Sequence, residues 1–369
     1  MDSLLAAFEG IEDPRVERTK SYPLTDVMFL VLCAVLCGVE SWRGVEDFGE
    51  DRLDWLRKYL PFENGIPSHQ TVGRIISLLK GDCVTKAFVQ FMASIFSCHE
   101  DEIIALDGKT LRRSFDKASG QKPLHILNAW AINAGVSLGQ VKVDQKTNEI
   151  TAVPELLDML DIRHATIVAD AMNTQKAIAK KIIVSEADYA LPVKGNHKQL
   201  EEDIEHEFDT QPVNEKDKNI FLETVEKAHG RIEIRRYSIL SAAFLDQRKD
   251  WAGLKNIGKV LNETFHDGKT STEIRYFLLS FDGVERFAQT VRGHWGIENR
   301  LHWVLDVTFG EDDCRVRKDH APENFSTIRK LALNFLRKET STKLSIPRKQ
   351  ARAARKPEYL DLLLKGKMN

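Results

Sequence analysis

The chain has 369 residues, of which 42% are hydrophobic and 29% are charged, and its formal net charge is −2. This length allows two domains, or one domain with a large insertion, and the composition is typical of a soluble globular protein. Because the chain as a whole is not basic, any surface that binds nucleic acid must be local. The five cysteines show no CxxC spacing, which argues against a disulfide framework or a cysteine zinc site and favours a reducing compartment.

The sequence predicts neither a secretion signal nor a membrane span. The first residues, MDSLLAAFEGIEDPR, contain acids and no basic segment, unlike a signal peptide. The apolar run 27–39 is too short to cross a bilayer, so we expect a buried helix there. We therefore expect a cytoplasmic protein.

Residues 1–97 are expected to form an all-α domain. The expected helices cover residues 4–8, 27–39, 42–48, 51–59 and about 70–79. Ser68 can cap the last of these helices, and its outer face offers Arg74. A polar-to-basic helix in this position resembles a DNA-recognition helix. The preceding turn is long for a strict helix-turn-helix, and a plain helical bundle is the alternative.

From about residue 98 the pattern becomes α/β. Strand patterns at 102–106, 124–133, 136–143, 166–169 and 189–193 alternate with helical patterns at 151–160, 175–185 and 199–208. This alternation predicts a mixed sheet with helices packed on it. Residues 211–280 favour strands and are expected to form a small β-rich sheet beside the active site. Helices over 284–307 and 324–338 would complete a catalytic domain at 98–340, and 341–369 would be a basic tail.

Two aspartates stand at the ends of predicted strands. Asp107 and Asp170 each follow a short apolar run, and functional groups collect at the carboxyl ends of strands in open α/β sheets. Carboxylates are the ligands that Mg²⁺ prefers. Either aspartate alone could instead be a turn residue or a helix cap.

The predicted helix 284–307 carries an ionisable face. Residues four apart share a helical face, so His294, Glu298, His302 and Asp306 lie together. This face is either catalytic or only a half-buried structural face. A zinc site of His294, Glu298 and His302 is a weaker alternative, because it leaves the two aspartates unexplained.

Only one of the two acids on this helix can join Asp107 and Asp170 around a pair of metal ions. Glu298 has the longer side chain, whereas Asp306 lies near the helix end, where the dipole disfavours a carboxylate. We therefore expect Glu298 to be the third acid. Asp306 is expected to be structural and paired with Arg300, Arg315 or Arg317.

Several motifs resemble one known family. They are FEGIEDPRVERTKSYPLTDVMFL (8–30), IALDGKTLRRS (104–114), IVADAMNTQ (167–175), YALPVKGNH (189–197), HGRIEIRRY (229–237) and HWGIENRLHWVLDVTFGEDDCRVR (294–317). With them, nearly the whole chain resembles the DDE transposases of the insertion-sequence type, in particular the H-repeat-associated proteins found near Rhs elements.

The resemblance implies a fold, a site and partners. It implies an α/β protein with an RNase H-like mixed-sheet core, a β-rich insertion and a catalytic, metal-binding triad of Asp107, Asp170 and Glu298. The implied cofactors are two Mg²⁺ (or Mn²⁺) ions, and no small-molecule cofactor is expected. The implied partner is double-stranded DNA, both element ends and target, bound by a homodimer that would be nucleoid-associated.

The chain departs from the wider family around the third acid. Many relatives have a Tyr–Arg–Glu–Lys signature, whereas this chain has Val291, His294 and Leu305 in the other three places. Phosphate contacts are therefore expected from other residues. The local candidates are Arg292, His302, Arg315 and Arg317, and the other expected contacts are Arg74, Lys109, Arg112, Arg113, Lys194, Asn196, Arg231, Arg235 and Arg236. Lys109, Arg112 and Arg113, and likewise Lys194 and Asn196, could instead be solvated residues of charged turns.

Three tryptophans receive separate predictions. Trp251, in the insertion, could stack on a displaced base, although a core position is the more ordinary one. Trp295 and Trp303 are expected to pack between the helix and the sheet.

The predicted function is DNA transposition. Water cuts the DNA at an element end, and the freed 3′-hydroxyl attacks target DNA, both at one metal site. The alternatives are a metal-dependent DNA nuclease without strand transfer and a catalytically idle DNA-binding descendant of a transposase.

Overall fold

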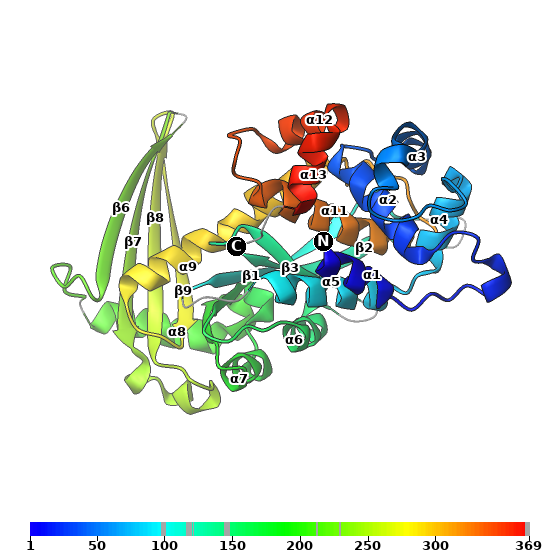
Figure 1. Ribbon diagram of the computed structural model, residues 1–369. Coiled ribbons are helices and arrows are strands. Elements are labelled where there is room, and N and C mark those ends of the chain that lie inside the picture. Colours follow the sequence, from blue (N-terminus) through cyan, green and yellow to red (C-terminus); the bar gives the residue numbers. More distant parts are fainter. Residues whose placement is uncertain are drawn as a thin grey trace.

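The computed structural model describes residues 1–96, 101–115, 120, 122–143, 148–211, 213–228 and 230–365. A nine-stranded mixed sheet runs through the molecule in the order β3-β2-β1-β4-β5-β9-β8-β7-β6. In Figure 1, α6 and α7 lie beneath its central strands and α11 lies above them. Within the described ranges, no helix is long and apolar enough to cross a membrane.

The central strands match the predicted apolar runs. They are β1 (Ile103–Leu111), β2 (Leu124–Ala131), β3 (Val136–Val143), β4 (Thr166–Ala169) and β5 (Asp188–Val193). β1 pairs antiparallel with β2 and parallel with β4, and β4 pairs parallel with β5. The predicted mixed α/β architecture is confirmed.

The β-rich insertion does not form a sheet of its own, contrary to the prediction. Its strands are β6 (Phe221–Ala228), β7 (Arg231–Ser241), β8 (Asn256–His266) and β9 (Lys269–Leu279). β9 pairs antiparallel with β5, so the central sheet simply continues into the insertion. In Figure 1 the far ends of these long strands project beyond α9 (Val284–Ile297), which packs across their lower part. The alternating segment 224–239 is a hairpin with Gly230 at a φ of +73° between its strands.

The N-terminal helices are α1 (Asp2–Glu9), α2 (Leu24–Leu36), α3 (Trp42–Leu56), α4 (His69–Leu78) and α5 (Gly81–Ile95). Two short helices were expected where α3 is continuous. Gly49 lies in its middle, and a Cβ atom there would lie 2.7 Å from Ile66 and 3.0 Å from Leu30. The glycine thus serves close packing rather than a helix end. Ser68 caps α4 as predicted, accepting from Thr71 N–H at 3.4 Å.

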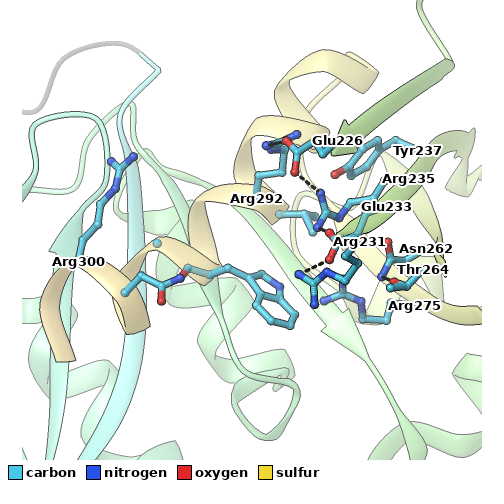
Figure 2. Close-up of a pocket in the computed structure, with 14 residues that line it drawn as sticks. Glu226, Arg231, Glu233, Arg235, Tyr237, Asn262, Thr264, Arg275, Arg292 and Arg300 are labelled. Atoms are coloured by element: carbon cyan, nitrogen blue, oxygen red, sulfur yellow. Dashed lines mark hydrogen bonds and ion pairs between the residues drawn. The ribbon is translucent and has the colours of Figure 1, made fainter. Parts of the chain in front are cut away.

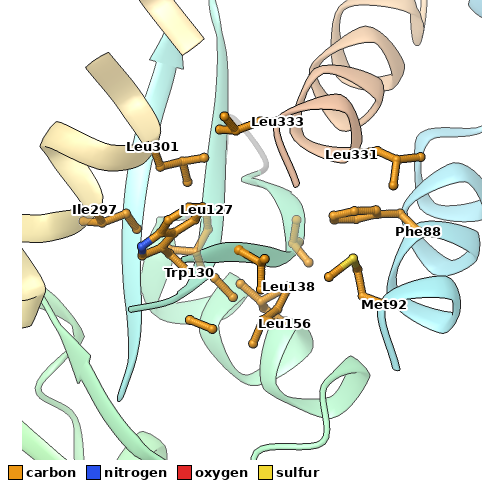
Figure 3. Packing of buried hydrophobic residues seen from close by; sticks show 14 of the residues in the cluster. Phe88, Met92, Leu127, Trp130, Leu138, Leu156, Ile297, Leu301, Leu331 and Leu333 are labelled. Carbon is orange, nitrogen blue, oxygen red and sulfur yellow. The ribbon is translucent and has the colours of Figure 1, made fainter. Parts of the chain in front are cut away.

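Further helices lie around the sheet. They are α6 (Glu149–Met159), α7 (Lys176–Val184), α8 (Lys198–Thr210), α9 (Val284–Ile297), α10 (Trp303–Thr308) and α11 (Ala321–Lys338). α5 and α11 share a core with the sheet. Figure 3 shows Phe88 and Leu331 facing each other between these helices, with Trp130 and Leu301 packed near Ile297.

The C-terminal segment is not a free basic tail. It forms α12 (Ile346–Arg355) and α13 (Pro357–Lys365). Trp55 Nε1–H donates to Asp361 Oδ1 at 2.9 Å, which joins α13 to α3. Lys349 is buried, and its Nζ lies 3.2 Å from Glu339 Oε2. The run of basic residues conceals helices whose inner faces pack on the rest of the protein.

Candidate active site

The sheet register brings the first two acids together. Leu106 of β1 is paired with Ala169 of β4, so Asp107 and Asp170 follow at the same level of two neighbouring parallel strands. Asp170 ends β4, as predicted. Asp107 does not end its strand, because β1 continues to Leu111 along β2 alone. The two aspartates therefore meet where the parallel pairing of β1 with β4 ends, not where β1 itself ends.

The third acid begins a π-helical turn, Glu298–His302, between α9 and α10. Trp303 N–H donates to the carbonyl of Glu298, five residues earlier. Such wide turns often occur at functional sites. The helix predicted over 284–307 is thus nearly continuous. The wider turn rotates the ionisable side chains that follow it relative to those before it.

Two histidines of this helix reach the two aspartates. His302 Nδ1 lies 3.1 Å from Glu298 Oε2 and 3.4 Å from Asp107 Oδ2. His294 Nε2 lies 3.9 Å from Asp170 Oδ1 and has no hydrogen-bond partner among the described residues. The three residues of the predicted triad therefore lie near one another. His302 contacts both Asp107 and Glu298, and His294 lies beside Asp170.

The cluster has the donors and the charge that suit a divalent cation. Ligand atoms of Asp107, Glu298 and His302 lie within 4.8 Å of one another. Burial, together with the negative charges of Asp170, Glu149 and Glu298, raises the pKa of Asp107 to about 7. Crowded carboxylates of this kind are neutralised when Mg²⁺ or Mn²⁺ binds.

The other helical acid has a different partner. Asp306 pairs with Lys109 of β1, not with Arg300, Arg315 or Arg317 as expected. Lys109 also contacts Glu311, which is completely buried. Burial opposes a charged lysine, but these carboxylates outweigh it and raise the pKa of Lys109. Both Lys109 and Asp306 are therefore engaged inside the protein.

The sequence comparisons fit this arrangement of acids. Residues 99–335 match the family model described as "Transposase DDE domain", and residues 5–92 match the model described as "DDE_Tnp_1-associated". The chain belongs to the DDE transposase family. The "H repeat-associated putative transposase YhhI" of Escherichia coli (strain K12) is 39% identical over 99% of this chain and 98% of its own length.

Other proteins show the same relation. The "Putative transposase YncI" of Escherichia coli O157:H7 is 40% identical over 99% of this chain and 95% of its own length. Among solved structures, a piggyBac transposase synaptic complex with hairpin DNA aligns at a TM-score of 0.45 with 10% identity, covering 99% of this chain and 80% of that one.

Several predicted DNA contacts lie on the segments that follow β1 and α10. Arg112 pairs with Asp312 at 3.3 Å and Arg113 with Asp313 at 3.1 Å. Arg317 lies over the ring of Phe115, and Arg315 is exposed.

A small hollow lies beside Asp170. Lys194, exposed after β5, lines it together with Asp170 and His294. Asn196 is exposed nearby and donates to the carbonyl of Ala171 at 2.9 Å. Arg74 is exposed on α4, as expected.

A larger cleft of about 500 Å³ lies between the insertion strands and α9. Figure 2 shows its charged lining, which is Arg231, Arg235, Arg275, Arg292, Arg300, Glu226 and Glu233. Five arginines against two glutamates make this cleft cationic in a chain of net charge −2. Its Trp295 and Arg275 also line the hollow beside Asp170. The two cavities thus adjoin, and the smaller one reaches Asp170.

Among the predicted DNA contacts that line neither cavity, Arg236, His302 and Lys109 are held by carboxylates of the protein. Side chains alternate along a strand, so Arg236 points away from Arg235 and pairs with Glu223 at 2.7 Å and Glu263 at 2.5 Å. His302 is only 3% exposed, and Lys109 is buried in its ion pairs. All three side chains contact carboxylates of the protein itself.

Two of the three tryptophans differ from expectation, whereas Trp251 has the core position that the sequence favoured for it. Trp295 and Trp303 are 60% and 56% exposed, although both were expected to pack. Trp295 instead offers a ring to the cleft, with the guanidinium of Arg275 at 5.5 Å from its centroid. Trp251, the suggested base-stacking residue, is buried.

Sequence reasoning missed Glu149 and His125. Glu149 accepts from His125 Nε2 at 2.7 Å and from Asn173 Nδ2 at 3.2 Å, beside the catalytic strands. A Cβ atom at Gly108 would lie 1.9 Å from Glu149 Oε1, so a side chain directly after Asp107 would displace Glu149. That glycine was the one available signal of a close neighbour.

Proposed function

We propose that this protein is a DNA transposase whose Asp107, Asp170 and Glu298 hold two Mg²⁺ (or Mn²⁺) ions and support phosphoryl transfer at insertion-sequence ends. The observation that carries the proposal is the convergence of Glu298 on Asp107, with Asp170 on the adjacent strand. The strand order β3-β2-β1-β4-β5, antiparallel and then parallel, supports an RNase H-like core.

The chemistry needs two displacements at phosphorus. In cleavage, water attacks the phosphorus at the element end, and the bond to the 3′ oxygen breaks to give a 3′-hydroxyl. In transfer, that hydroxyl attacks a target phosphodiester, whose own 3′ oxygen leaves with a proton. Bound divalent cations would activate the attacking oxygen and stabilise charge on the leaving oxygen.

The protein's residues divide the remaining work. Asp107 is held by the pairing of β1 with β2, and Asp170 directly follows the paired strand β4, so rigid elements position the backbone of both. Glu298, which begins the π-helical turn after α9, is the acid that comes from a helix and not from the sheet. Lys194 and His294 line the hollow beside Asp170 and can face a phosphate oxygen there.

DNA would follow the basic surfaces that flank the acids. The cleft residues Arg231, Arg235 and Arg292 are suited to phosphates of one strand, and Trp295 offers a face on which a base can stack. Arg112, Arg113, Arg315 and Arg317 provide further basic side chains on the segments that follow β1 and α10. Arg74 on α4 would contact DNA farther from the acids. Because two element ends must be joined, a homodimer on DNA is part of this proposal.

A plasmid assay separates this function from its alternatives. The full chain is incubated with plasmid carrying element-flanking DNA, with Mg²⁺ or with EDTA. Joined products that require Mg²⁺ support the transposase. Mg²⁺-dependent nicking without joining supports the nuclease, and retention of DNA without cleavage supports the idle DNA-binding protein.

A further inference from the structure

We infer that His302 is a positioning residue, whose Nδ1–H holds the carboxylates of Asp107 and Glu298 together without itself binding the metal ion. The inference rests on the proposed function, because it concerns the same site. It assigns a role to a side chain that was expected to contact DNA but that lies buried between two of the acids.

The neighbour of His302 determines which ring nitrogen carries the proton. Asn128, completely buried on β2, has its Nδ2 at 3.3 Å from the carbonyls of both Asp107 and Ile126. These two acceptors fix the amide so that its NH₂ group, not its oxygen, faces the imidazole. Nδ2 also lies 3.4 Å from His302 Nε2. An NH₂ group can only donate, so Nε2 is an acceptor and the proton of the neutral ring is on Nδ1.

The proton on Nδ1 points at two carboxylates. Glu298 Oε2 lies at 3.1 Å and Asp107 Oδ2 at 3.4 Å. The two acids repel each other, and a donor between them lowers the cost of their approach. The second oxygen of each carboxylate remains available to a cation.

Glu298 is the acid that needs this help. Its side chain is 70% exposed, whereas that of Asp107 is 19% exposed and starts from a paired strand. An exposed glutamate samples several rotamers. The histidine, in contrast, is fixed by burial and by the π-helical turn, in which the neighbouring Leu301 is completely buried. The buried His302 therefore orients the exposed side chain of Glu298.

Direct ligation by His302 would need a different tautomer. Nδ1 would have to lose its proton, and Nε2–H would then face the NH₂ group of Asn128, donor against donor. Loss of a hydrogen bond to a metal-binding side chain typically lowers metal affinity 10- to 100-fold. This range gives the size of effect that a positioning role predicts.

Mn²⁺ binding to the full chain tests the inference without DNA. The free Mn²⁺ signal in electron paramagnetic resonance gives the affinity of wild type, His302→Asn and His302→Leu. Asn places an amide N–H near the position of Nδ1, so its affinity should stay within about threefold, whereas Leu should weaken binding about 10- to 100-fold. Equal affinity of Leu and wild type, or equal weakening in Asn and Leu, would overturn the inference.

A second measurement needs no variant. In Mn²⁺-loaded wild type, electron spin echo modulation should show no directly bound histidine nitrogen, and a bound nitrogen would contradict the positioning role.

Asp107→Asn and Glu298→Gln serve as reference variants in the measurement of Mn²⁺ affinity. If neither weakens Mn²⁺ binding, the proposed metal site itself fails; if both do and His302→Leu does not, only the role of His302 fails.

Discussion

Lys109 Nζ lies 2.6 Å from Glu311 Oε2, and the pair joins the strand of Asp107 to the segment that follows the helix of Glu298. Both side chains are buried. Removing one partner of a buried ion pair leaves an uncompensated charge and typically costs about 3–5 kcal/mol. Lys109→Met should therefore lower the free energy of unfolding by about this amount, measured by urea denaturation.

Arg112 supplies the matched control for that variant. It forms an ion pair with Asp312, but its side chain is 80% exposed. Exposed pairs contribute about 0–1 kcal/mol, so Arg112→Met should be nearly neutral. Equal destabilisation by the two variants would mean that the buried pair has no special structural role.

The pH dependence of stability should report on Glu323 of α11. Burial, helped by the charges of Asp82 and Glu155, raises the pKa of Glu323 to about 7 from its ordinary value near 4.5. A raised carboxyl pKa favours the folded state below pH 4.5, and this contribution is lost as the pH rises through 7. Glu323→Gln should thus be stabilising at pH 8, by up to about 3 kcal/mol, and nearly neutral at pH 4.

Thermal melts at the two pH values check this expectation. Glu285→Gln, at an exposed glutamate of α9, is the control and should change stability little at either pH. A Glu323→Gln variant that is less stable than wild type at pH 8 would show that the carboxylate is favourable where it lies.

The cleft predicts a difference between two adjacent arginines of β7. Arg235 lines the cleft and Arg236 lies on the opposite face, yet each is paired with two glutamates. Arg235→Gln should weaken DNA binding and reduce the slope of log affinity against log salt by about 1. Arg236→Gln should leave both unchanged. Equal effects would argue that the cleft does not hold DNA.

Divalent cations should stabilise the folded protein through the acids. A ligand that binds only the folded state at 100 times its Kd adds about 3 kcal/mol. Mn²⁺ should therefore raise the melting temperature of wild type and have a much smaller effect on Asp107→Asn. A rise of the same size in both proteins would place the bound ion elsewhere.

Local sequence patterns were enough to predict the central strands and the position of Asp170 at the end of β4, but not that β1 continues past Asp107. Short apolar runs such as Thr166–Ala169 have few alternatives to a buried strand. The insertion and the long helix after it were also recognisable from their different periodicities. The sequence did not show that the insertion continues the central sheet, because the pairing of β9 with β5 joins residues that are far apart in the sequence.

The side-chain partners could not be predicted for the same reason. Nothing near Lys109 in the sequence indicates that Glu311, 202 residues later, will neutralise it. Similarly, the basic run in 341–369 gave no sign that Lys349 would be buried beside Glu339. A charged residue is exposed by default, and only the tertiary structure shows which carboxylate it meets.

The central claim is that Glu298, not Asp306, is the third acid of the site. Glu298 converges on Asp107, whereas Asp306 is engaged with Lys109. The direct test is Mg²⁺-dependent cleavage of element-flanking DNA by Glu298→Gln and Asp306→Asn, with DNA retention and folding measured in parallel. We predict that Glu298→Gln binds DNA but does not cleave it, and that Asp306→Asn keeps substantial cleavage. An active Glu298→Gln with a folded but inactive Asp306→Asn would contradict the assignment.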